Sequence, residues 1–176
     1  MPRVVSDAGP LIHLAQVCEL HLLKKLFGCV SIVIEVKREA VDEGIRLGYA
    51  DAGLIMEGVQ EGWILIEDLP KPAVSVVRKL AKDENLSQAD AKTLILAKQT
   101  QAQIIVDEKV LSDLARMFGL QTWSTWTVLL ESLRRKHIRF ADVETAITEL
   151  EEKRHKLKAE QAAEILRTAR FIEEQK

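Results

Sequence analysis

Five short apolar segments recur along the chain, and stretches with the 3.6-residue apolar spacing of a helix separate them. The apolar segments, each expected to form a strand, cover residues 4–5, 30–34, 63–66, 104–106 and 122–123. Strands that alternate with helices pair in parallel, and the helices then cover both faces of the sheet. The pattern therefore predicts an α/β fold with three layers around a central parallel sheet.

Helices are expected to follow each of these strands. Their predicted ranges are residues 11–27, 35–47, 52–61, 72–82, 88–99, 109–118 and 125–135. Asp51 and Ser87 have the positions and side chains of N-caps, whereas Gly28 and Gly119 stand where helices end.

The pattern changes after Phe140 to helix with dense charge, over residues 142–153 and 158–174. Each segment keeps one apolar stripe, as a helix that packs on another surface does. The chain of 176 residues is thus expected to consist of an α/β domain (residues 1–137) and a C-terminal helical extension (residues 138–176).

The overall charge does not point to a nucleic-acid partner, because 25 Lys and Arg residues face 27 Asp and Glu residues and the net charge is −2. Any such partner must be bound by a local basic patch. The candidates for this patch are Lys109, Arg116, Arg134, Arg135 and Lys136.

Cysteine and histidine usage argues against zinc or a redox site. Cys18 and Cys29 lack metal-ligand or redox spacing, and we expect both to be buried or half-buried in a reducing cytoplasm. The histidines are scattered, which is typical of structural or surface positions: His13, His21, His137 and His155. No targeting segment and no membrane span is expected.

Acidic residues follow two of the predicted strands. Asp7 comes after the first strand, and Asp107, with Glu108 beside it, comes after the fourth. Ligands of open parallel sheets bind beyond the carboxyl ends of the strands, and Mg²⁺ and Mn²⁺ prefer carboxylate oxygens. The alternative for each acid is a helix cap or turn, which is the commoner role of an isolated Asp in such a position.

Two further helices offer acids to the same edge. Asp90 completes a capping box with Ser87 but also borders the apolar stripe of its helix, so it can cap and bind metal together. Glu35, Glu39 and Glu43 are spaced four residues apart, which ordinarily indicates a solvated face, and the residues alone do not single one out.

Four stretches resemble the PIN-domain superfamily: VVSDAGPLIHLAQ (4–16), LFGCVSIVIEVKREAV (26–41), LSQADAKTLILA (86–97) and IIVDEKVLSDLARMFGL (104–120). The likeness is strongest to small prokaryotic PIN proteins whose first motif reads D-A/S-x-P-L-I, related to VapC toxins. It covers roughly residues 3–136, and it rests on the order and spacing of the motifs.

This resemblance implies a Rossmann-like fold and Mg²⁺- or Mn²⁺-dependent cleavage of RNA. By position, the catalytic acids are Asp7, Glu39, Asp90 and Asp107, with Glu35 as the fallback for Glu39. The implied metal ligands are Asp7, Asp90, Asp107 and Glu108, and Asp107 is favoured over Glu108 as the principal acid.

The resemblance also implies partners, namely an RNA substrate, a small antitoxin protein and a second copy of the chain in a homodimer. The stripe of Ala162, Ile165, Leu166 and Ala169 either makes that interface or folds back on its own domain. One departure from the family is Gly9, which stands where many members have Ser or Thr. Ser124 or Thr125 could supply a hydroxyl instead, although each also suits a helix cap.

Two other functions compete with RNA cleavage. One is a PIN-fold module that binds RNA or protein without cutting, which the presence of all four acids disfavours. The other is a metal-dependent phosphohydrolase for small molecules. The chain lacks the Gly-rich phosphate-binding motifs, so a nucleotide-cofactor enzyme is disfavoured.

Overall fold

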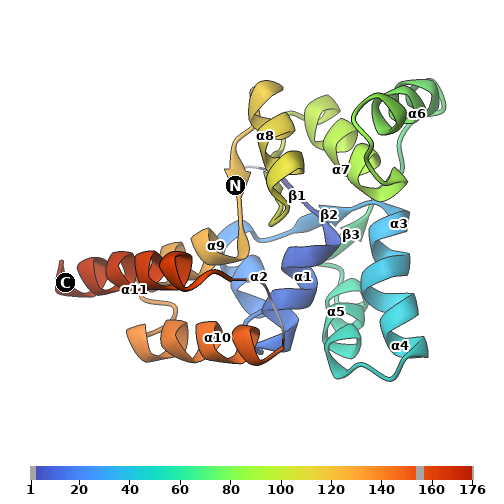
Figure 1. Cartoon of the computed structure of the whole chain (residues 1–176). Coiled ribbons are helices and arrows are strands. Elements are labelled where there is room, and N and C mark those ends of the chain that lie inside the picture. Colours follow the sequence, from blue (N-terminus) through green and yellow to red (C-terminus); the bar gives the residue numbers. More distant parts are fainter. Residues whose placement is uncertain (1–2, 154–156, 176) are drawn as a thin grey trace.

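A parallel five-stranded sheet runs through the centre of the protein, in a computed structural model that describes residues 3–153 and 157–175 (Figure 1). Its strands are β1 (Val4–Ser6), β2 (Val30–Ile32), β3 (Ile64–Ile66), β4 (Gln103–Ile105) and β5 (Thr122–Trp123). Each predicted apolar segment forms one of these strands, and the expected α/β class with a central parallel sheet is confirmed.

The strand order is β3-β2-β1-β4-β5, so the chain builds outward from β1 in both directions. Val5 of β1 lies opposite Ser31 of β2 on one side and opposite Ile104 of β4 on the other. The chain adds β2 and β3 on one side of β1 and then crosses over to add β4 and β5 on the other side. The direction in which strands are added therefore reverses at the boundary between β1 and β4. In open parallel sheets, a crevice for ligands lies beyond the carboxyl ends of the strands at that point.

Helices cover both faces of this sheet. They are α1 (Ala8–Gln16), α2 (His21–Phe27), α3 (Ile34–Lys37), the π-helix η1 (Arg38–Glu43), α4 (Gly44–Arg46), α5 (Ala50–Gln60), α6 (Ala73–Asp83), α7 (Gln88–Gln99), α8 (Lys109–Met117), α9 (Thr125–Arg134), α10 (Phe140–Glu152) and α11 (Ala159–Glu174). In Figure 1, α7 and α8 lie above the sheet with α6 outside them, and α1, α2, α5 and α9 lie below it.

Burial follows from this layering. Val4 and Val5 of β1 and Ile104 of β4 are fully buried, as expected for inner strands covered on both faces. The edge strand β3 exposes Leu65 and Ile66 to about 40%, and its length of three residues leaves little edge for another chain to pair with.

The helix expected over residues 11–27 is broken in two. Cys18 has a left-handed backbone (φ 58°) between α1 and α2, a conformation that cannot continue an α-helix. The apolar spacing is preserved across the break, so periodicity alone did not reveal it. The expected burial of Cys18 and Cys29 is also wrong, because both are exposed.

The helix expected over residues 35–47 is regular only at its ends. Between Arg38 and Glu43 it is a π-helix, in which each backbone N–H reaches five residues back. The next helix begins at Ala50 with Tyr49 as its N-cap, so the expected capping role of Asp51 is wrong.

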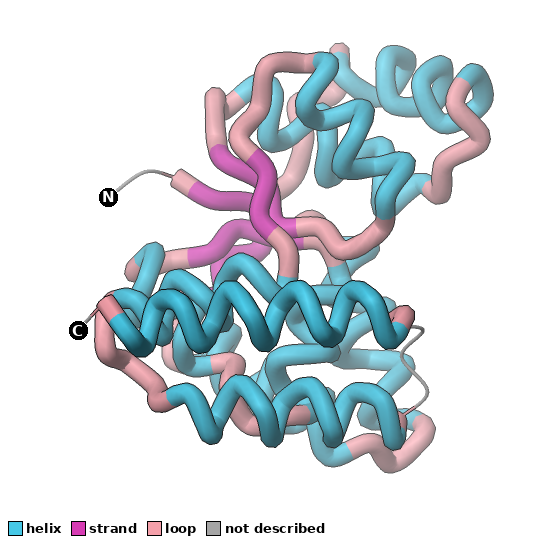
Figure 2. Tube along the Cα trace, turned by 60° about the vertical axis from the view of Figure 1, so that its left-hand side comes forward, coloured by secondary structure: helices cyan, strands magenta, loops and turns pink. Residues whose placement is uncertain are grey.

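The two C-terminal helices lie side by side in Figure 2, and α11 packs along α9. Ala162, Ile165 and Ala169 are buried, and Leu166 is half-buried against the core. The apolar stripe of α11 is therefore covered largely within its own chain. Over the described residues, no helix has both the length and the apolar character needed to cross a membrane.

Candidate acidic site

Asp7 and Asp107 lie at the same edge of the sheet. Ser6 and Ile105 are partners in the β1–β4 pair, and the backbone N–H of Asp7 donates to the carbonyl of Ile105 at 3.0 Å. Asp107 lies two residues after Ile105, so the two acids flank the boundary at which the sheet reverses its winding.

Asp7 is the centre of the site. It stands in the N-cap position of α1, yet its side chain makes no cap hydrogen bond. Burial raises the pKa of its carboxyl group from 3.8 to about 7, against an opposing hydrogen bond from the backbone of Ala8. Three other carboxylates raise it further, so four acids interact electrostatically in this part of the structure: Asp7, Asp90, Glu39 and Asp107.

Asp90 performs two tasks. Its backbone N–H donates to Ser87 Oγ at 3.0 Å, and its carboxylate Oδ2 accepts from the backbone N–H of Ser87 at 3.3 Å. The predicted capping box is therefore confirmed. The side chain still repels the charges of both Asp7 and Glu39, which places it at the rim of the site.

The three glutamates of the α3–η1 segment have three different environments. Glu35 accepts from Lys92 Nζ at 2.6 Å, and Glu43 accepts from Arg46 Nε at 3.0 Å. Only Glu39 faces the acids: burial raises its pKa, and Asp90 raises it further. The π-helical turn removes the common face that a spacing of four residues would give in an α-helix.

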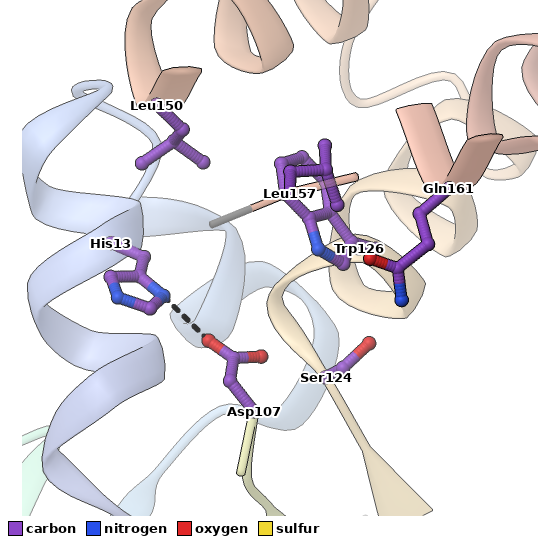
Figure 3. Close-up of a pocket in the computed structure, with 7 residues that line it drawn as sticks. All are labelled: His13, Asp107, Ser124, Trp126, Leu150, Leu157 and Gln161. Atoms are coloured by element: carbon purple, nitrogen blue, oxygen red, sulfur yellow. Dashed lines mark hydrogen bonds and ion pairs between the residues drawn. The ribbon is translucent and has the colours of Figure 1, made fainter. Parts of the chain in front are cut away.

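Asp107 is held by three hydrogen bonds. Its Oδ1 accepts from the backbone N–H of Thr125 at 2.7 Å, and its Oδ2 accepts from Thr125 Oγ1 at 2.6 Å. The imidazole Nδ1 of His13 lies 2.6 Å from the same Oδ2 (Figure 3). Burial alone would raise the pKa of Asp107, but His13 and Thr125 together outweigh it and lower the pKa below the ordinary value.

The neighbouring Glu108 serves a different purpose. Its Oε2 accepts from the backbone N–H of Leu111 at 2.7 Å, and Glu108 is the N-cap of α8. The structure therefore brings Asp107, rather than Glu108, towards Asp7. The expected role of Glu108 as a metal ligand stays a prediction, and in this structure its carboxylate caps α8.

His13 is the one site residue that the sequence did not indicate. The sequence predicted a structural or surface role for His13, whereas the structure places its imidazole in direct contact with Asp107. The sequence offered one hint, because His13 lies four residues after Gly9 and therefore about one helical turn away on α1. In the structure, a Cβ on Gly9 would stand 3.9 Å from His13 Cε1 and 4.0 Å from Asp7 Oδ2. Gly9 thus lies between the two side chains. His155 falls outside the described residues.

Ser124 and Thr125 follow β5, and each has one of the two roles expected of them, a helix cap or a hydroxyl for the acidic site. Ser124 caps α9, where its Oγ accepts from the backbone N–H of Thr127 at 3.2 Å. Thr125 instead donates its hydroxyl to Asp107, as described above. Thr125 thereby connects α9 to the acidic site.

Four of the five basic side chains proposed as a patch are paired with acids. Lys109 and Arg116 both bind Asp113 on the surface of α8. Arg134 and Arg135 bind Glu131, whose pKa falls to about 2. These arginines stand at the opposite end of α9 from Thr125, roughly 14 Å away at 1.5 Å per residue.

The donor set suits a hard divalent ion, since all four acids offer carboxylate oxygen. Within the residues that the structure describes, however, no three His, Cys, Asp or Glu side chains are arranged to hold one metal ion as they stand. Like charges repel, and Asp90 and Asp107 instead accept protein hydrogen bonds. The residues fit the ion in chemistry, and binding requires their side chains to turn towards it.

The family model described as PIN domain matches residues 3–170. The chain belongs to the PIN-domain family, whose members are typically nucleases and generally use divalent metal ions. The match extends through α10 and into α11.

The chain is similar to the solved structure "Crystal structure of PAE2754 from Pyrobaculum aerophilum". The TM-score is 0.48 at 16% sequence identity, over 67% of this chain and 97% of that one. No curated protein sequence matches this chain.

Proposed function

We propose that this protein is an Mg²⁺- or Mn²⁺-dependent ribonuclease that uses Asp7, Glu39, Asp90 and Asp107. The observation that supports this most is the state of Asp7, a half-buried residue whose carboxyl pKa is raised to about 7 by desolvation and by the three other acids. A divalent cation would offset this concentrated negative charge and would be held by it.

A bound divalent ion would supply an activated water and would offset charge on the phosphate and the leaving oxygen. Asp7 and Asp90 would hold the ion from two sides of the crevice, while Glu39 would hold it or orient the attacking water. Asp107 retains a lone pair on Oδ1, because three of its roughly four acceptor positions are filled by His13 and Thr125. Those bonds keep Asp107 ionised and fixed in direction.

The second candidate is a PIN-fold module that binds RNA or protein and cuts weakly or not at all. This alternative is supported by the hydrogen bonds that Asp90 and Asp107 already make, and by the lack of three described side chains arranged to hold one metal ion. A ribonuclease would cleave bound RNA when metal is added, whereas a binding module would bind RNA or protein with little or no cleavage.

The test uses the full chain and end-labelled single-stranded RNA with Mn²⁺, with Mg²⁺ and with EDTA. We expect cleavage with metal only, reduced about 100-fold or more by Asp7→Asn or by Asp90→Asn, because each substitution removes one anionic ligand at nearly constant volume. Asp113→Asn on α8 is the matched control, since it makes the same chemical change at a surface ion pair. Equal cleavage by the wild-type protein and both site variants would assign the activity to another source, and binding without cleavage would favour the second candidate.

Two narrower proposals concern partners. One is that the chain is the toxin of a toxin–antitoxin pair, which an adjacent gene for a small DNA-binding protein would support. The other is that it forms a homodimer, measurable by light scattering of the full chain. Since the stripe of α11 is largely covered within the chain, such a dimer would need another surface.

A further inference from the structure

A cavity of about 280 Å³ opens directly beside Asp107. Figure 3 shows the residues that line it: His13, Asp107, Ser124, Trp126, Leu150, Leu157 and Gln161. His13 and Asp107 belong to the acidic site, and Ser124 and Trp126 belong to the β5–α9 junction. The C-terminal extension contributes the remaining wall, so the acidic site and the extension share one cavity.

The walls of this cavity suit an uncharged planar group. The half-buried indole of Trp126 offers an aromatic face, and Leu157 adds apolar surface. The described residues that line the cavity include no Lys or Arg. Its volume lies just below the range of typical small-molecule sites, roughly 300–1,000 Å³, and suits a single ring system.

Gln161 supplies a directional polar group. Its Oε1 accepts from the backbone N–H of Lys158 at 3.2 Å, as part of the capping box of α11, and this contact orients the amide. The amide nitrogen then remains as a donor beside the cavity, and Figure 3 shows this nitrogen on the side of Ser124. An aromatic face with a fixed amide donor is the combination by which proteins hold and read an unstacked nucleobase.

We propose that this cavity binds one nucleobase of single-stranded RNA, next to the phosphate presented to the acids. Trp126 stacks on the base, and the Gln161 amide donates to an acceptor on its edge. The C-terminal extension thereby helps to select the cleavage position. This inference rests on the proposed ribonuclease function, because it takes RNA as the ligand.

The first measurement is binding without cleavage, using the full chain in EDTA and four fluorescent RNA oligonucleotides that differ only in one central base. Trp126→Leu should raise the Kd about tenfold for all four, because it removes the aromatic surface on which the base stacks. Trp126→Phe retains a ring and should recover much of the affinity. Gln161→Leu should instead bring the four Kd values closer together, because it removes the donor and leaves the stacking surface.

The matched control is Gln175→Leu, an exposed glutamine at the other end of α11. It should leave all four Kd values unchanged. Thermal melting of each variant shows whether the fold is retained, and Trp126→Phe and Gln161→Leu remain informative if Trp126→Leu fails to fold.

The second measurement is cleavage of the same oligonucleotides with Mn²⁺. Gln161→Leu should bring kcat/KM for the four substrates closer together, whereas Gln175→Leu should not. If Asp7→Asn abolishes cleavage but both cavity variants keep wild-type binding and wild-type base preference, the base site is wrong and the ribonuclease stands. If the wild-type protein does not cleave but the cavity variants alter binding as described, the base site stands and the ribonuclease is wrong.

Discussion

The imidazole Nδ1 of His13 lies 2.6 Å from Oδ2 of Asp107, although 94 positions separate the two residues in the sequence. The contact joins α1, which follows the first strand, to the loop that follows the fourth. Thr125 adds the start of α9 to the same carboxylate. Three elements thus meet at one side chain, which makes Asp107 a structural junction as well as a candidate catalytic acid.

Loss of the Thr125 hydroxyl should weaken both the fold and the site. Thr125 is buried, and Thr125→Val leaves the half-buried Asp107 Oδ2 with one donor fewer. We expect the free energy of unfolding to fall by about 1–3 kcal/mol, measured by urea denaturation. Thr125→Ser keeps the hydroxyl and should lose less than half as much. A loss in Thr125→Ser without a loss in Thr125→Val would show that the methyl group, and not the hydrogen bond, matters.

Removal of His13 should change the titration of Asp107. In the folded protein His13 lowers the pKa of Asp107 through its hydrogen bond and its charge, against the opposing effect of burial. His13→Leu should therefore raise that pKa, and the acidic limb of the cleavage–pH profile should move to higher pH. A carboxyl titration followed by ¹³C NMR measures the same shift without activity. An unchanged Asp107 pKa would contradict this role of His13.

Glu39 and Glu35 should respond differently to the same substitution. Glu39→Gln removes a charge that acts on Asp7 and Asp90, so it should reduce metal-dependent cleavage by about tenfold or more while the fold is retained. Glu35→Gln instead breaks the ion pair with Lys92. Each of these two side chains is only about one-fifth exposed. It should lower the melting temperature and leave cleavage per folded molecule unchanged. If Glu35→Gln reduced cleavage and Glu39→Gln only lowered the melting temperature, Glu35 would be the site residue and Glu39 the structural one.

The contribution of Asp7 to the stability of the metal-free protein should fall as pH rises from about 4 to 7. Over this range the unfolded chain releases the proton of Asp7, whereas the folded chain keeps it because its pKa is raised from 3.8 to about 7. The difference in stability between wild type and Asp7→Asn isolates this group and should change by on the order of 4 kcal/mol across the range.

The measurement is urea unfolding in EDTA at several pH values for both proteins. Asp7→Asn should become the more stable of the two as pH rises towards 8. Mn²⁺ should reverse that order, because only the wild-type protein has the full set of carboxylates. Parallel stability curves for the two proteins would contradict the raised pKa.

Local sequence patterns were sufficient for much of this protein. The short apolar segments identified all five strands. The signal has its clearest cause in the inner strands β1, β2 and β4, because strands covered on both faces are largely apolar. The spacing from Ser87 to Asp90 identified the capping box, since both partners of that contact lie within one turn. The positions of Asp7 and Asp107 after their strands likewise placed them at one edge of a parallel sheet.

Other features depended on the tertiary structure. The equal spacing of Glu35, Glu39 and Glu43 did not single one out, and the π-helix together with packing against α7 turned only Glu39 towards the acids. The break at Cys18 was hidden because both halves of the helix keep an apolar face.

The contact of His13 with Asp107 and the shared cavity wall at Gln161 join segments far apart in the chain. Apolar spacing and capping residues report on neighbours within about two turns of helix or along one strand. Which distant side chains meet is decided by strand order and by how the covering helices pack. For this chain, the sequence therefore determined the elements and most of the acids, and the assembled sheet determined which partners hold them.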